Sequence, residues 1–202
     1  MFQATRHLPA EWESQSAVQI TLPHAGTDWA KMLEAVMPCF VAIAKSISRF
    51  QKVLIVCHDV AETKRLFDGV DTGNLIFAEA PSNDTWARDH GGIGIEADGK
   101  PLLLDFVFNG WGLKFAADQD NLITRRLFEA GIFKSHIQYG GLVLEGGGIE
   151  SDGMGTLLTT AECLLSPNRN PHLSPEEIET SLKTIFGLER VLWLHHGYLA
   201  GD

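Results

Sequence analysis

The segment IEADGKPLLL (residues 95–104) recurs 54 residues later as IESDGMGTLL (residues 149–158). Each copy places an Asp-Gly step between two strand-like runs, which is a strong local signal for a β-hairpin. Glycines precede both copies in register, at positions 92 and 94 and at positions 146 and 148. Such hairpins are common, so two unrelated ones would share the step by coincidence, but this alignment spans ten positions without a gap. It therefore predicts a repeated unit of strand, hairpin and strand, accompanied by a helix.

A carboxylate stands just before the glycines of each copy, Asp89 in the first and Glu145 in the second. If the repeat is real, its symmetry brings these two carboxylates toward a common centre. Asp89 lies in the stretch NDTWARDHGG (residues 83–92), which also carries Trp86 and Arg88 and is expected to be a loop feeding a strand. Paired carboxylates beside aromatic surface suit a flat cation. The alternative is a solvated turn with one surface ion pair.

Along the whole sequence, the spacing of apolar residues predicts an α/β chain. Strands are expected at residues 17–22, 52–57, 75–78, 92–96, 102–108 and 191–194, the last of them buried. Helices are expected at residues 29–47, 61–67, 119–130 and 174–186. Thr27 is expected to cap the first helix and Pro38 to kink or split it. Ser174 and Glu177 form a capping-box signature for the last helix, and Gly187 marks its end.

Composition narrows the class of partner. Sixteen Lys and Arg against 26 Asp and Glu leave a formal charge of −10, which argues against nucleic acid and anionic membranes and mildly favours small cationic substrates. Cys39, Cys57 and Cys163 form no Cys-x-x-Cys pair, which indicates a reducing compartment rather than a disulfide framework. The first residues carry no secretory signal, and no apolar run reaches membrane-spanning length. We therefore expect a cytoplasmic chain that folds as a single domain over residues 1–202.

Four ordered motifs resemble the agmatine deiminase and bacterial-type peptidyl-arginine deiminase family. They are Trp-Ala-Arg-Asp (86–89), Phe-Asn-Gly-Trp-Gly (108–112), Leu-Glu-Gly-Gly-Gly (144–148) and Cys-Leu-Leu-Ser-Pro-Asn-Arg-Asn-Pro (163–171). The opening Leu-Pro-Ala-Glu-Trp-Glu (8–13) also fits. The family's fold is the pentein α/β propeller, in which strand-rich units surround a guanidine site. The resemblance thus implies a partial pentein propeller, incomplete because the C-terminal part is absent.

The resemblance also implies guanidine hydrolysis, in which a cysteine thiolate attacks the guanidinium carbon, ammonia leaves and water resolves the thiouronium adduct. Motif match assigns the guanidinium-binding, catalytic carboxylates to Asp89 and Glu145. Trp86 and Trp111 are expected to bind substrate by cation–π contact, with an ordinary core role as the alternative. His90 is a candidate for tuning the site. Agmatine, giving N-carbamoylputrescine, is the first expected substrate and free or peptidyl arginine the second, with no cofactor and no metal.

The chain departs from the family pattern at its end. Gly201-Asp202 resembles the first two residues of the family's Gly-Asp-Asp-Thr-Asp-x-His-x-Asp motif, so the catalytic histidine and cysteine are expected beyond residue 202. Cys163 lies in the Asn-Pro-rich motif on an expected strand, and Cys39 and Cys57 are expected in the core, so none of them is expected to be the nucleophile. We expect the truncated N-terminal part of a deiminase that binds weakly and does not turn over. A non-catalytic pentein-like binding module is the other alternative, and homo-oligomer formation stays open.

Overall fold

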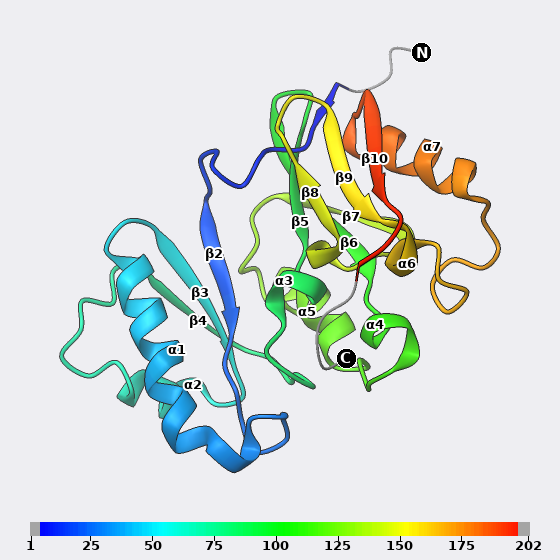
Figure 1. Ribbon diagram of the computed structural model, residues 1–202. Helices are drawn as coiled ribbons and strands as arrows, with labels where there is room; N and C mark the ends of the chain where they lie inside the picture. The colour runs from blue at the N-terminus through cyan, green and yellow to red at the C-terminus, as the bar shows by residue number, and fades with distance from the viewer. Residues whose placement is uncertain (1–4, 198–202) are drawn as a thin grey trace. The chain divides into compact units, whose positions relative to one another are not determined.

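The computed structural model describes residues 5–197, so the Gly201-Asp202 step singled out above lies outside the described residues. By its internal contacts the chain divides into two compact units. The first comprises Met1–Glu13, Arg88–Ala117 and Phe133–Asp202, and the second comprises Ser14–Ala87 and Asp118–Ile132. Both units combine strands and helices (Figure 1), which confirms the α/β class. The single domain expected over residues 1–202 stays a prediction.

The second unit is built on a parallel sheet in the order β2-β3-β4. Its strands are β2 (Ala17–Thr21), β3 (Lys52–Cys57) and β4 (Leu75–Glu79), close to the predicted positions. Helices α1 (Leu33–Ser48) and α2 (Val60–Arg65) make the crossovers that parallel neighbours require (Figure 1). Strand β3 is central and buried from its second residue onward. The core around it consists of Leu22, Val41, Ala44, Val53, Ile55, Cys57, Phe67 and Leu75.

Helix α1 corrects three expectations. Thr27 does not cap it, because the Thr27 hydroxyl donates to the carbonyl of His24 (2.8 Å) and a 3-10 turn at Ala30–Met32 precedes the helix. Pro38 lies inside α1 without splitting it, whereas the kink that was the other expectation stays a prediction. Its exposed position lets water satisfy the carbonyl that lacks a helical donor. Cys39, expected in the core, is exposed on this helix.

The first sheet of the first unit has the order β1-β5-β6-β7. Its strands are β1 (Arg6–His7), β5 (Ile93–Ala97), β6 (Lys100–Val107) and β7 (His136–Val143). The predicted hairpin is confirmed, since β5 and β6 pair antiparallel with Ala97 opposite Lys100. Asp98 (φ 50°) and Gly99 (φ 71°) both adopt left-handed conformations, as a two-residue type I′ turn requires. Strand β6 then pairs parallel with β7, which the sequence did not reveal.

The second sheet of this unit repeats the same pairings. Its order is β10-β9-β8, with strands β8 (Ile149–Ser151), β9 (Thr156–Thr160) and β10 (Arg190–Leu194). Strands β8 and β9 form the second predicted hairpin, and β9 pairs parallel with β10. The repeat thus extends to a third strand in each copy. Strand β10 was expected to be buried, but it is the sheet's edge and leaves Leu192 and Leu194 about half exposed.

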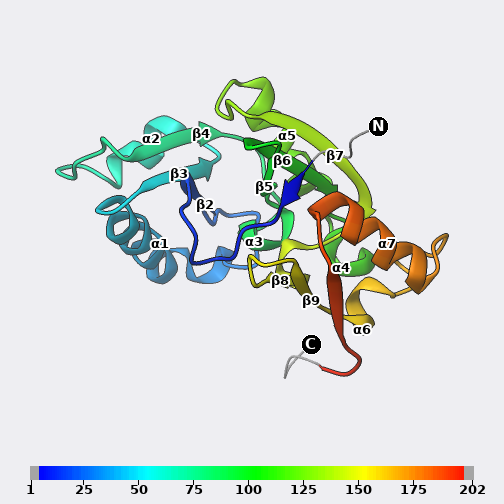
Figure 2. The same cartoon turned by 90° about the horizontal axis from the view of Figure 1, so that it is seen from above.

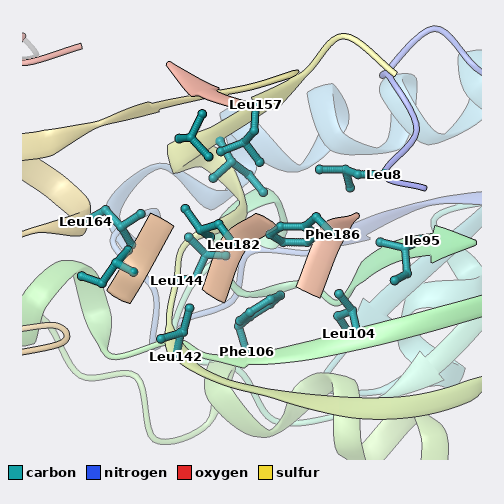
Figure 3. Close-up of a cluster of buried hydrophobic side chains, with 13 residues drawn as sticks. Leu8, Ile95, Leu104, Phe106, Leu142, Leu144, Leu157, Leu164, Leu182 and Phe186 are labelled. Atoms are coloured by element: carbon teal, nitrogen blue, oxygen red, sulfur yellow. The ribbon is translucent and has the colours of Figure 1, made fainter. Parts of the chain in front are cut away.

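Helix α7 (Pro175–Phe186) lies beside β10 and completes the core of the first unit (Figure 2). The predicted capping box is present, because Ser174 and Glu177 each accept a hydrogen bond from the other's backbone N–H. Gly187 ends the helix at φ 73°. Figure 3 shows apolar side chains from the sheets gathered around Leu182 and Phe186 of this helix.

Several short elements were not predicted. The stretch expected as a loop contains a helical turn, α3 (Ala87–His90), and the expected strand around Cys163 is instead α6 (Ala161–Leu164). Another turn, α4 (Gly110–Leu113), follows β6. The helix predicted at 119–130 consists of a 3-10 turn (Asp120–Leu122) and α5 (Ile123–Glu129). Within residues 5–197, no helix has the length and apolar character needed to cross a bilayer.

Candidate functional site

Asp89 is the residue at which the motifs of the first unit meet. Its Oδ1 accepts a hydrogen bond from the backbone N–H of Gly147 (3.1 Å), which lies in the glycine turn before β8. Its Oδ2 accepts from the indole N–H of Trp111 (3.2 Å) in α4. Three of the motifs thus converge on one carboxylate, from residues that lie 22 and 58 positions beyond it in the sequence.

The pKa of Asp89 depends on its burial, on its hydrogen bonds and on the charge of Glu145. Burial raises the pKa of Asp89, and the hydrogen bonds from Trp111 and Gly147 oppose that rise. The negative charge of Glu145 raises the pKa of Asp89 further. The charge of Glu145 thus acts on Asp89, and the shared catalytic centre expected for the two carboxylates stays a prediction.

The glycine run before β8 allows this turn to lie very close to α3. The 3-10 turn Gly146–Gly148 lies against α3 so closely that a Cβ on Gly146 would collide with the carbonyl oxygen of Arg88. A Cβ on Gly147 would collide with Oδ1 of Asp89. Neither glycine is needed here for a positive φ. They are needed because backbone must contact backbone and carboxylate directly.

Trp111 reaches Asp89 from an unusual backbone. Gly110, Trp111, Gly112 and Leu113 all have positive φ, between 59° and 79°, so α4 is a left-handed turn. Only glycine adopts this conformation without strain, and Trp111 and Leu113 adopt it nonetheless. Asn109 stabilises the turn by accepting from the N–H of Gly112 (2.9 Å). The surrounding structure therefore maintains strain at the residue that contacts Asp89.

The structural role foreseen for Trp111 has support, whereas its substrate-binding role stays a prediction. Its ring packs edge to face against Phe108 and Phe115, with centroids 5.0 and 5.7 Å away, as a structural aromatic would. Its N–H is committed to Asp89. The contact expected from the sequence was through the ring face, whereas the contact in the structure is a hydrogen bond from the ring edge.

Glu145 is buried and paired inside the chain. Nε of Arg169 lies 2.9 and 3.0 Å from its two oxygens, and Nη2 of Arg169 lies 2.8 Å from Oε1. Arg169 lies in the motif at 163–171, and no role for it was expected from the sequence. A buried arginine needs a carboxylate partner, but the burial of Arg169 is visible only in the structure, so the sequence offered no signal for this pair.

The other charged residues of the 83–92 stretch have separate partners. Arg88 pairs with Glu11 (2.7 Å) and Glu150 (3.2 Å), all three well exposed, so the surface ion pair of the alternative interpretation is also present. Trp86 belongs to the second unit, where its indole N–H donates to Asp84 (3.2 Å). The substrate-binding role of Trp86 stays a prediction.

His90 follows Asp89 and is 4 % exposed, packed 6.1 Å from the ring of Phe108. Neither ring nitrogen has a hydrogen-bond partner among the described residues. Burial lowers the pKa of His90 to about 4, so the ring is neutral at physiological pH. A neutral, buried imidazole does not offset the charge of Asp89.

Comparison with known proteins gives a consistent result. Residues 7–202 match the family model described as Porphyromonas-type peptidyl-arginine deiminase. The chain is 36% identical over 196 residues to the agmatine deiminase of Pseudomonas aeruginosa (strain LESB58), covering 94% of this chain and 53% of that protein. It thus spans about half the length of the curated relatives it matches.

Solved structures of deiminases superpose closely on this chain. The cysteine-to-serine variant of C. jejuni agmatine deiminase with substrate bound superposes with a TM-score of 0.93 at 37% identity, covering 100% of this chain and 60% of that one. A candidate arginine deiminase from Porphyromonas gingivalis superposes with a TM-score of 0.90 at 52% identity, covering 98% and 59%. The chain belongs to the Porphyromonas-type peptidyl-arginine deiminase family.

Proposed function

We propose that this chain carries the guanidinium-binding carboxylates of a guanidine deiminase, with agmatine as its first substrate. The observation that supports this most is the convergence of Trp111 and Gly147 on Asp89, with the charge of Glu145 acting on the same carboxylate. A guanidinium is planar and presents paired N–H donors, so it suits carboxylates fixed on a rigid framework. We propose further that the two copies of the hairpin repeat, β5-β6-β7 and β8-β9-β10, belong to a pentein propeller.

In this proposal the reaction hydrolyses agmatine to N-carbamoylputrescine and ammonia through a cysteine-thiouronium adduct. None of the three cysteines is assigned as the nucleophile. Burial raises the pKa of Cys57, which disfavours the thiolate, and Cys39 belongs to α1 of the second unit. Cys163 is exposed on α6 and has no Asp89 or Glu145 hydrogen bond among the described residues. The chain by itself is therefore expected to bind guanidines without releasing ammonia.

Free or peptidyl arginine is the second candidate substrate, favoured by the 52% identity to the candidate arginine deiminase of P. gingivalis. If the protein is instead a binding module without catalysis, the same guanidine binding is expected. No ammonia should then be released by any longer form of the protein. Ammonia release by a form of the protein longer than residues 1–202 would separate it from the deiminase.

The test is titration calorimetry of residues 1–202 with agmatine, arginine, an arginine peptide and putrescine. Agmatine should bind most tightly, and putrescine, which has an ammonium in place of the guanidinium, should bind much more weakly. Asp89→Asn should abolish agmatine binding, whereas Asp98→Asn, which removes the same charge from the hairpin turn, should not. Equal binding of agmatine and putrescine, or agmatine binding unaffected by Asp89→Asn, would reject the proposal.

A further inference from the structure

The pair between Arg169 and Glu145 is the most deeply buried ion pair among the described residues. The side chains are only 8 % and 7 % exposed. Arg169 approaches through Nε and Nη2 together, and its Nε lies at nearly equal distances from the two carboxylate oxygens. This contact by two nitrogens of one guanidinium, called the fork below, fixes the plane of the Glu145 carboxylate as well as its position. A single point charge does not do this.

The loop that carries Arg169 is held on both sides of that residue. The side-chain amide of Asn170 donates to the carbonyl of Val143 (2.9 Å) and accepts from its N–H (3.0 Å), two residues before Glu145. On the other side, Asn109 donates to the carbonyl of Asn168 (2.8 Å). Arg169 and Glu145 are thus anchored to a common piece of backbone. The orientation of the carboxylate is set before any ligand arrives.

The left-handed turn α4 also contacts this pair. A Cβ on Gly112 would stand 2.9 Å from Nη1 of Arg169. The turn that presents Trp111 to Asp89 therefore also lies against the guanidinium that holds Glu145. The two carboxylates have separate partners, but one turn of backbone is in contact with both sets of partners.

The two carboxylates, Glu145 and Asp89, differ in whether an ion pair balances their charge. Glu145 is neutralised by Arg169, whereas Asp89 accepts hydrogen bonds only from neutral N–H donors and has no ion pair within the part of the chain that the structure describes, although the charge of Arg88 also acts on it. We propose that Arg169 is a positioning residue for guanidine binding, which holds Glu145 neutralised in one orientation and leaves Asp89 as the carboxylate without an ion pair of its own. This inference rests on the proposed function. It requires that Arg169 stays paired with Glu145 when a guanidine binds. This is possible because a carboxylate has lone pairs beyond those that one guanidinium occupies.

Calorimetry and NMR test the inference together. Arg169→Lys keeps the charge but loses the fork, so agmatine affinity should fall roughly 10- to 100-fold while the circular dichroism spectrum is unchanged. The control is Arg6→Lys, which removes hydrogen bonds to Ile185 and Gln138 in the same unit and should leave the affinity as it was. In the wild-type chain, the Nε–H resonance of Arg169 should be protected from solvent exchange and stay protected at saturating agmatine.

Unchanged affinity in Arg169→Lys would overturn the inference. So would loss of the protected Nε–H signal on adding agmatine, since Arg169 would then be a competitor that the ligand displaces. If Arg169→Lys fails to fold, the wild-type NMR titration decides alone. A wild-type chain that binds no agmatine would instead reject the proposed function, and this inference with it.

Discussion

The indole N–H of Trp111 donates to Oδ2 of Asp89 over 3.2 Å from a backbone held at φ 59° and ψ 48°. A tryptophan in this conformation is strained by about 1–2 kcal/mol. Strain of this kind persists where surrounding contacts over-determine it, and here Asn109 and the packing of Phe108 and Phe115 do so. The relation between these two residues gives the first prediction.

Trp111→Phe should raise the pKa of Asp89, because the indole N–H stabilises the charged carboxylate and phenylalanine offers no donor. The loss of the hydrogen bond should also cost about 1 kcal/mol of stability. Carbon-13 NMR of the Asp89 carboxyl during a pH titration measures the first effect. Trp193→Phe removes a comparable indole bond to Glu179 and should leave the Asp89 titration unaltered. An unchanged Asp89 pKa in Trp111→Phe would show that the bond contributes nothing in solution.

Gly112→Ala should destabilise the first unit more than Gly99→Ala does. Both glycines have positive φ, 79° and 71°, so both substitutions carry the same backbone penalty of about 1 kcal/mol or more. Gly99 has open space around it, whereas a Cβ on Gly112 would stand 2.9 Å from Nη1 of Arg169, so the guanidinium that is paired with Glu145 must shift. We expect the difference to be about 1–3 kcal/mol, as for other overpacked sites. Amide hydrogen exchange in β6 and β9 measures it, and equal effects would contradict the close approach.

The features that the sequence predicted are those that depend on neighbours along the chain. The Asp98-Gly99 turn and the Ser174 capping box are local patterns, and both are present. The two repeated hairpins are also readable along the sequence, and both are present. By contrast, the pairing of Arg169 with Glu145 depends on a contact across 24 residues. No local pattern specifies such a contact, which is why the role of Arg169 was missed.

The errors have the same origin. Cys39 and Leu192 are apolar residues in apolar patterns, and each was placed in the core, but exposure depends on which face or edge the neighbouring elements cover. The left-handed turn at Trp111 contradicts local propensity outright, because non-glycine residues avoid that conformation. Local reasoning fails here at a candidate site, where strain is expected to concentrate.

In the second unit, Asp120 should make stability fall as pH rises. It is 1 % exposed, and burial raises its pKa to about 6 against hydrogen bonds from the N–H groups of Asn83 and Asp84, with the charges of Asp84 and Asp118 raising it further. The unfolded chain releases this proton near pH 3.8, so between about pH 4 and 6 the folded state binds more protons. The free energy of unfolding should therefore drop by up to about 3 kcal/mol across that range.

Amide exchange in β3, corrected for intrinsic rates, measures this dependence. Asp120→Asn should flatten it. Asp68→Asn, at an exposed position of the same unit, serves as the control and should leave the dependence as it was. A wild-type unit whose stability rises from pH 4 to 6, with no change in Asp120→Asn, would contradict the assignment.

His90 should produce the reverse dependence in the first unit. Its pKa is lowered from 6.5 to about 4 by burial, so the unfolded chain binds a proton that the folded chain refuses over that interval. Stability should be fully present above pH 6.5 and should fall by up to about 3 kcal/mol as the pH drops toward 4. His90→Phe removes the titrating group and two buried nitrogens that lack partners among residues 5–197, and it places a ring of similar shape beside Phe108. That variant should be more stable than wild type at pH 5 by amide exchange in β6, and its advantage should shrink toward pH 7. A constant difference between the two proteins at both pH values would mean that His90 takes up its proton in the folded state as readily as in the unfolded one.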